Sequence, residues 1–500
     1  MGCSVGVAMS RRTTPVMWRL GRSLPTRRAA PTSAVEDSLA ARERAVGLQP
    51  DQPFLLRPDG SADMDVLAFF TSSRFKLLSE QTQESYAKDL RMFLSFLESQ
   101  ERSWAQCTTE DIADYEHWRR RDRSNPNSVS GAKFSREHAA CKTFFDWQHR
   151  RGTIPATPFD GSRRSGEARF SGGSLRPRDA RQNRVKWLTP RAYRQWRDTG
   201  LGGRLPDGGH DPSWRGRNDG RNLAFANLLW TSGLRLREAG SLLVLELPDV
   251  DRQAQYLRSR VADAVAKGRG RDFWMAATTR HEVDGYIVST RAAAIGKARS
   301  KGRYENVPNR LVIVGRDRAN LRVRDTQDRV STVNLNRLGW RDRLTLFIET
   351  EAGLEPAMLF LAGSGMPISY ETWETIFTTA NVRCAQLGVR VSCYPHMLRH
   401  SFALRMLLTL MHAFDQRMGL TPEERKDYRL LFGDPWTLVQ TLLGHTNPQT
   451  TRDIYLEPVS GLQVDIFLNP GESDDENRFT EVVARQLAAT GLVNDGSRST

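Results

Sequence analysis

Two stretches in the C-terminal part of the chain, PHMLRHSFA (395–403) and LLGHTNPQTTRDIYL (442–456), decide how the rest of the sequence is interpreted. The first holds an H-x-x-R pair, His396 and Arg399, and the second places Tyr455 ten residues after the histidine of an L-G-H segment. Guanidinium groups bind phosphate oxygens, imidazoles transfer protons, and an activated tyrosine hydroxyl is a nucleophile. Together the two stretches indicate chemistry at a phosphate group.

Two further segments lie upstream and carry residues of the same kinds. TSGLRLREAGSL (231–242) contains Arg235 and Glu238, and AKGRGRDFWM (266–275) contains Lys267 beside an expected strand. Two arginines on separate helices can clamp one phosphodiester and stabilise its pentacoordinate transition state. Their charge and that of a lysine would lower the pKa of a tyrosine, and the lysine can protonate a departing alkoxide. Such a site needs no metal, because arginines supply the charge that a metal cation otherwise provides.

Lys267 is the only lysine between Lys186 and Lys297, in a chain where nine of the 73 basic residues are lysine. A position that keeps lysine in such a chain indicates a group that must release a proton, which arginine cannot do. A lysine in a glycine-rich turn is also a common surface residue, so both interpretations stay open.

The other candidates have ordinary structural interpretations as well. Arg235 and Glu238 lie three residues apart and can form a helix-surface ion pair. His400 is interpreted as a packing or supporting group. His445 directly follows a glycine, which is consistent with a close approach to backbone or ligand, and Tyr455 can be a core tyrosine.

The composition favours a nucleic-acid partner. The chain has 500 residues, a formal net charge of +15 and a sequence pI of about 9.9, a balance typical of proteins with polyanionic partners. The strong arginine bias is equally typical of a GC-rich genome. Five scattered cysteines exclude a disulfide scaffold and a Cys-based zinc knuckle, and no apolar run is long enough for a membrane helix.

The pattern of apolar residues predicts an α+β protein that is mainly helical. Tyr86, Leu90, Phe93 and Leu97 fall on one helix face within a small N-terminal helical bundle. A larger C-terminal domain with a small β-sheet follows, and its strand-like segments are SLLVLEL (241–247), DFWMAAT (272–278) and RLVIVG (310–315). We expect a disordered basic tail over 1–60, the bundle over 61–155, a basic flexible linker over 156–184, the larger domain over 185–470, and an acidic tail that can form a helix over 471–500.

The polar faces of the bundle are rich in cations and predict a DNA-facing surface, although a solvated charged face has the same composition. The candidate DNA-binding residues are Arg119, Arg120, Arg121, Lys133, Arg136 and Lys142. The linker behind the bundle suits a clamp that closes around a duplex, and suits an ordinary tether almost as well.

In type and order, the four segments strongly resemble the tyrosine recombinase (phage integrase) family. That family has an arginine in a G-[LM]-R-x-x-E helix, a hairpin lysine, an H-x-x-R helix, an L-G-H segment and a tyrosine shortly after that histidine. In the bundle, SYAKDLRMFLSFL (85–97) and KTFFDWQHRRGTIPATPF (142–159) look like the family's core-binding, SAM-like domain. The resemblance covers about 61–470, with gaps.

The resemblance implies a site-specific DNA recombinase or integrase that cuts and rejoins DNA through a 3′-phosphotyrosine intermediate, without metal, ATP or cofactor. The implied roles are Tyr455 as nucleophile, Arg235, Arg399 and His445 on phosphoryl oxygens, Lys267 as general acid, His396 as general base, and Glu238 and His400 in support. The implied partners are double-stranded DNA at specific recombination sites, three further copies in a tetrameric synapse, and accessory DNA-bending or directionality factors. The implied place is a bacterial cytoplasm, at the nucleoid and away from membranes.

Two segments depart from the family pattern. Residues 296–345 and 412–436 look like insertions, and they lengthen the spacing on either side of Arg399. Three other functions stay open: a type IB topoisomerase with the same chemistry, a catalytically silent DNA-binding protein of the same fold, and a zinc hydrolase with three histidines as ligands. Two features argue against a zinc site: HMLRH (396–400) lacks the glutamate of an HExxH motif, and the positive charge of Arg399 would repel a metal dication.

Overall fold

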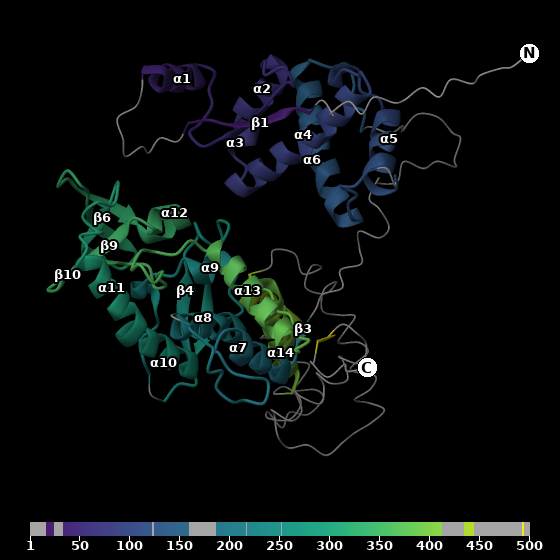
Figure 1. Cartoon of the computed structure of the whole chain (residues 1–500). Coiled ribbons are helices and arrows are strands. Elements are labelled where there is room, and N and C mark those ends of the chain that lie inside the picture. The colour runs from purple at the N-terminus through teal and green to yellow at the C-terminus, as the bar shows by residue number, and fades with distance from the viewer. Residues whose placement is uncertain are drawn as a thin grey trace, which may run out of the picture. The chain divides into compact units, whose positions relative to one another are not determined.

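The computed structural model of the chain describes residues 17–24, 34–122, 125–159, 187–216, 218–251, 253–412, 435–444 and 493–494, and the structural statements below concern these residues. The chain divides into two compact units, Met1–Asn183 and Arg184–Thr500, and each is described by itself (Figure 1). Within the described residues, no helix has the length and apolar character to cross a bilayer.

The N-terminal unit is a helical bundle with a two-stranded sheet. Its longest helices, α4 and α6, pack against each other, and phenylalanines from several helices fill the core. Phe69 and Phe144 meet edge to face with ring centroids 5.3 Å apart, a geometry that aromatic pairs prefer. The elements are β1 (Arg19–Arg22), α1 (Ala34–Ala45), β2 (Pro53–Leu56), α2 (Met64–Thr71), α3 (Ser73–Lys76), α4 (Glu80–Ser99), η1 (Trp104–Gln106), α5 (Thr109–Arg120) and α6 (Gly131–Arg151).

The expectation that residues 1–60 are disordered is wrong for the part of this segment that the structure describes. β1 pairs antiparallel with β2, with Leu20 opposite Leu55, and Trp18 and Leu55 are buried in the core of the bundle. Composition and local periodicity miss this arrangement, because each strand is short and its partner lies far away in the sequence.

The C-terminal unit contains a helical part and a separate sheet. α7, α8, α13 and α14 enclose an apolar core, in which Phe225 stacks on Trp373 with ring centroids 3.5 Å apart. A five-stranded sheet with the order β10-β9-β6-β7-β8 lies at the end of this unit away from α7 and α14 (Figure 1). The elements are β3 (Trp187–Leu188), α7 (Pro190–Gly200), α8 (Asp219–Ser232), α9 (Leu236–Gly240), η3 (Val244–Glu246), β4 (Tyr256–Val261), β5 (Arg271–Ala276), α10 (Ala277–Tyr286), η4 (Ile287–Arg291), α11 (Ala292–Arg299), β6 (Leu311–Asp317), β7 (Asn320–Arg324), β8 (Val330–Asn334), η5 (Leu335–Arg337), α12 (Trp340–Arg343), β9 (Leu346–Thr350), β10 (Gly353–Pro356), α13 (Thr372–Gln386), α14 (Pro395–His412), α16 (Pro435–Leu443) and β11 (Val493–Asn494).

The predicted α+β class is confirmed, and two of the three predicted strands are present as β5 and β6. SLLVLEL (241–247) is not a strand and contains η3 instead. The reason is local, since the Glu246 carboxylate accepts a hydrogen bond from the backbone N–H of Leu243 at 3.0 Å and closes a turn.

The expected insertion over 296–345 folds as most of the five-stranded sheet, which continues through β9 and β10. We refer to residues 296–356, which form this sheet with η5 and α12, as the inserted sheet after that expectation, and the sheet has its own apolar core. The predicted linker, the second insertion and the acidic tail lie outside the described residues, except at their ends and at β11.

Candidate active site

The N-terminus of α9 brings Arg235 and Glu238 into contact. The Glu238 carboxylate accepts hydrogen bonds from the backbone N–H and from a terminal guanidinium nitrogen of Arg235, each at 2.8 Å. The ion pair suggested by their spacing is therefore present. It is not an isolated surface pair, because the Glu238 side chain is fully buried while that of Arg235 is 26% exposed.

Arg271, at the start of β5, is a residue that the sequence analysis missed. Its two terminal nitrogens donate to the two carboxylate oxygens of Glu238, both at 2.8 Å. Burial alone would raise the pKa of Glu238, but the hydrogen bonds and charge of Arg271 and the charges of Arg399 and Arg235 outweigh it and lower this pKa to about 2. Glu238 is therefore ionised at neutral pH, at the centre of an arginine cluster.

The same arginines hold the end of α16. Arg271 Nε donates to the carbonyl oxygen of Leu442 at 3.0 Å, Arg235 Nη2 donates to that of Gly444 at 3.4 Å, and Arg399 Nη2 donates to that of Leu443. The last carbonyls of a helix have no partner within the helix, and cations stabilise them further through the helix dipole. Three arginines thus fix the place where the L-G-H segment leaves α16.

Gly444 explains why a glycine precedes His445. Its φ is +61°, in the left-handed region, and a Cβ there would lie 2.7 Å from Cδ of Arg271. Any side chain at Gly444 would be strained and would push Arg271 from its place. The glycine before His445 in the sequence indicates a close approach, and the structure shows it between the Gly444 backbone and the Arg271 side chain. His445 and Tyr455 themselves lie outside the described residues.

Arg399 lies on α14 and is almost fully buried, with 1% exposure. One of its terminal nitrogens donates to the carbonyl oxygen of Gly233 at 2.6 Å. Gly233 ends α8 with a φ of +64°, and a Cβ at this residue would lie 2.2 Å from the ring of Phe402. The end of α8 and the end of α16 therefore meet at a single guanidinium group.

His396 lies one turn before Arg399 on α14 and keeps part of its ring exposed. The contacts that bury the rest of the ring, together with the positive charges of Arg399, Arg235 and Lys267, lower the pKa of His396. The imidazole is consequently favoured in its neutral, proton-accepting form at neutral pH.

His400 is buried beside His396, with their ring centroids 4.4 Å apart. Its other neighbour is Trp187, at 5.7 Å between ring centroids in an edge-to-face arrangement. This environment favours the interpretation of His400 as a packing group.

Lys267 lies in the loop that joins β4 to β5, is exposed, and has a left-handed φ of +56°. Asp263 organises the loop, since its carboxylate accepts from the backbone N–H of Gly270 at 2.6 Å. The backbone N–H of Ala264 donates to the carbonyl oxygen of Asn336, in η5, at 2.9 Å. The inserted sheet therefore supports the loop that carries Lys267.

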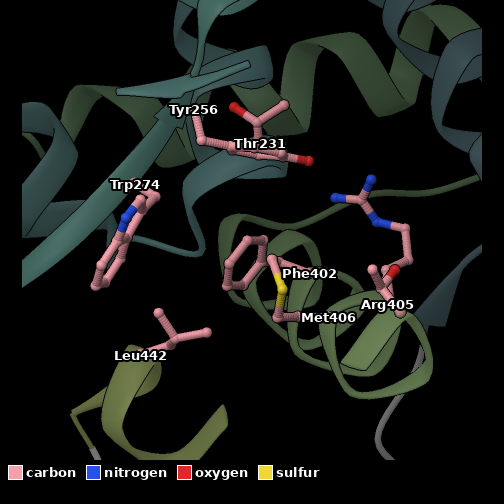
Figure 2. A pocket seen from close by; sticks show the side chains of 8 residues that line it. Thr231, Tyr256, Trp274, Phe402, Arg405, Met406 and Leu442 are labelled. Carbon is pink, nitrogen blue, oxygen red and sulfur yellow. The ribbon is translucent and has the colours of Figure 1, made fainter. Parts of the chain in front are cut away.

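A cavity of about 330 Å³ lies next to the arginine cluster. Leu442 of α16 lines this cavity, and its carbonyl oxygen accepts the hydrogen bond from Arg271. Figure 2 shows that Trp274, Phe402, Met406 and Leu442 form an apolar part, whereas Thr231, Tyr256 and Arg405 bring polar atoms. Arg405 stacks on Trp230 at 3.8 Å from the ring centroid, and burial lowers the pKa of Arg405 to about 10.

No group of three or more metal-ligating side chains occurs among the described residues.

The candidate DNA-binding residues of the N-terminal unit require one correction. Arg119 is buried, and its guanidinium is held by the Glu137 carboxylate at 3.0 Å and by the carbonyl oxygen of Asn127. Arg119 stabilises the bundle and does not face a partner. The other candidates lie at or near the surface, where Arg120 pairs with Glu116, Lys133 and Arg136 with Asp89, and Lys142 with Asp146, while Arg121 is exposed.

Comparison with known proteins finds a match within the N-terminal unit. Residues 73–152 match the family described as "Phage integrase, N-terminal SAM-like domain". These residues run from α3 through the end of α6 and leave out the small sheet, α1 and α2. A search of curated proteins finds no match.

Several solved structures are similar over most of the chain. The site-specific recombinase XerH bound to its difH substrate is 12% identical, with 81% of this chain and 85% of that chain covered and a TM-score of 0.42. XerA recombinase is 15% identical, with coverages of 80% and 98% and a TM-score of 0.29. The Tn1549 transposon integrase in complex with circular intermediate DNA is 13% identical, with coverages of 76% and 90% and a TM-score of 0.38.

Proposed function

We propose that this chain, which is similar to phage integrases over residues 73–152, is a site-specific DNA recombinase that works through a 3′-phosphotyrosine ester. The proposal is carried by the convergence of Arg235, Arg271 and Arg399 on the last turn of α16, directly before His445. An arginine cluster at this point provides fixed positive charge for a phosphodiester next to the segment that carries the candidate nucleophile.

In the proposed reaction, the Tyr455 hydroxyl attacks the scissile phosphorus. The bond from phosphorus to the tyrosine oxygen forms while the bond to the 5′ oxygen breaks. Neutral His396 accepts the tyrosine proton and Lys267 donates a proton to the departing 5′ oxygen. Rejoining is the reverse attack by a 5′-hydroxyl, and no ATP is needed because the ester conserves the bond energy.

Arg235, Arg399 and His445 are proposed to bind the non-bridging oxygens. A guanidinium carries five N–H donors, and within the described residues Arg235 uses one N–H on each of its two terminal nitrogens, toward Glu238 and Gly444. Its side chain is partly exposed, so a phosphate can reach it. Glu238 positions Arg235 and Arg271, because it is buried and ionised between them.

The nucleophile is tested with a nicked suicide substrate built from the DNA that flanks the gene. Tyr455→Phe is expected to bind this DNA and form no covalent adduct, whereas Tyr394→Phe is a matched control, since Tyr394 is exposed next to α14. An adduct that survives in Tyr455→Phe refutes the assignment. Absence of any adduct with the unaltered chain favours a silent DNA-binding protein, and relaxation of site-free supercoiled plasmid favours a topoisomerase.

The general acid is tested with a bridging 5′-phosphorothiolate, whose thiolate leaves without a proton. Lys267→Ala is expected to cleave ordinary DNA slowly and to recover on the sulfur substrate. Lys267→Arg is expected to recover little on ordinary DNA, because guanidinium holds its proton too tightly. An equal defect on both substrates makes Lys267 a phosphate contact and moves the acid role to His396.

The proposal extends to the conditions and partners of the reaction. Cleavage is expected to be unchanged in excess EDTA, and a loss that zinc restores contradicts the metal-free reaction. The proposed partners are double-stranded DNA at specific sites, a tetramer of this chain in the synapse, and accessory DNA-bending factors, with the bacterial nucleoid as the place of action.

A further inference from the structure

The inserted sheet carries a large share of the positive charge of the chain. Residues 296–345 contain 13 basic and five acidic residues, a net charge of +8, whereas the whole chain carries +15. These charges are held on a fixed surface, because the sheet has its own apolar core. Arg343 anchors the sheet to the rest of the unit through two hydrogen bonds to the buried Glu246, at 2.6 and 2.9 Å.

Ten of these 13 cations fall into two sets. Those paired with a carboxylate are Arg299 with Glu355, Arg324 with Glu349, Arg329 with Asp325, and Arg343 with Glu246. Those that are exposed and have no carboxylate within ion-pair distance in the described part of the chain are Lys297, Lys301, Arg316, Arg318, Arg322 and Arg337. Three of this second set, Arg316, Arg318 and Arg322, lie on or at the tip of the β6–β7 hairpin.

The tip of this hairpin is braced. Arg316 Nε donates to the carbonyl oxygen of Arg318 at 3.0 Å, and Arg316 Nη1 donates to that of Leu245 at 2.9 Å, outside the sheet. Arg318 occupies the turn between β6 and β7 with a left-handed φ of +50°, a conformation in which glycine or asparagine is less strained. The turn therefore presents an arginine at a position where local backbone preference does not favour one.

Arg322 lies on the outer face of the sheet, because its neighbours Leu321 and Val323 are fully buried on the inner face. It stands opposite Gly315 on β6 and Thr332 on β8. A Cβ at Gly315 would lie 2.8 Å from Arg322 Nε. The missing side chain of Gly315 thus makes room for the guanidinium to lie across the sheet.

We infer that the β6–β7 hairpin, through Arg318 and Arg322, binds the sugar–phosphate backbone of duplex DNA in addition to the contacts at the strand-exchange site. This inference rests on the proposed function. Guanidinium groups match phosphate oxygens with paired donors, and backbone contacts in DNA complexes come mainly from arginine and lysine. The centre of a protein–protein interface is depleted of charged residues, whereas Arg322 is a charged residue flanked by a glycine and a threonine.

The test is the salt dependence of binding to a 60-base-pair duplex of random sequence, measured by fluorescence anisotropy. In the double variant Arg318→Asn with Arg322→Gln, asparagine tolerates the left-handed turn at position 318, and glutamine keeps a long polar side chain on the strand. Loss of two phosphate contacts is expected to reduce the slope of log affinity against log salt by about 2. Circular dichroism and covalent trapping on the nicked substrate are expected to match those of the unaltered chain.

The matched control is Arg324→Gln with Arg329→Gln, which removes the same charge from the same sheet at arginines already paired with carboxylates. Its slope is expected to stay close to that of the unaltered chain. Equal slopes for the two double variants overturn the inference and leave the proposed function in place. Failure of the unaltered chain to bind the duplex or to form an adduct counts against the proposed function itself.

Discussion

Glu238→Gln tests whether a buried anion holds the arginine cluster together. The carboxyl is fully buried, and its pKa falls from 4.5 to about 2 on folding. Each unit corresponds to 1.36 kcal/mol, so ionised Glu238 adds about 3 kcal/mol to the free energy of unfolding at pH 7. A group whose pKa is lowered on folding stabilises above its unfolded pKa and loses this effect as pH falls. At pH 3 about 1 kcal/mol remains.

Glutamine resembles the protonated acid, so the variant is expected to be less stable by about 3 kcal/mol at pH 7 and by about 1 kcal/mol at pH 3. The assay is urea unfolding of the full chain. Pulsed hydrogen exchange of peptides from the C-terminal unit monitors the unfolding of that unit. Glu349→Gln is the control, because Glu349 is 55% exposed and pairs with Arg324 at the surface, where a change within about 1 kcal/mol is expected. The same loss at both pH values would refute the reasoning.

Three further predictions concern the site and the inserted sheet. Lys267→Gln is expected to raise the pKa of His396 toward its usual value, because a nearby positive charge is removed; imidazole NMR titration measures this, and an unmoved pKa contradicts it. Gly444→Ala is expected to destabilise the C-terminal unit by about 1–2 kcal/mol from its left-handed φ alone and to slow covalent trapping; unchanged urea midpoint and trapping rate count against the described packing. Arg343→Met is expected to cost about 3–5 kcal/mol in urea unfolding, because Glu246 stays buried without its partner; adding Glu246→Leu is expected to restore much of this, and no rescue argues against the pair.

The sequence predicts those features whose cause is local. The spacing of Arg235 and Glu238 predicts their contact, and it is present. A glycine before His445 predicts a close approach, and Gly444 packs against an arginine side chain in a left-handed conformation. Short apolar runs rich in β-branched or aromatic residues predict β5 and β6, because such runs are typical of strands.

The features that sequence reasoning misses depend on distant partners. Arg271 has no local signature in an arginine-rich chain, and only the fold brings it to Glu238. Arg119 has the composition of a surface cation, but Glu137 on the next helix draws it into the core. β1 and β2 are short strands whose pairing is fixed by burial of Trp18 and Leu55 rather than by propensity.

The loop of Lys267 and the buried carboxylate of Glu246 both find hydrogen-bond partners in the inserted sheet. Deleting the sheet would leave the backbone N–H of Ala264 without its Asn336 acceptor and the carboxylate of Glu246 without the guanidinium of Arg343. The C-terminal unit therefore cannot be shortened by removing residues 296–345 alone, because the backbone N–H of Ala264 and the carboxylate of Glu246 would both need new partners.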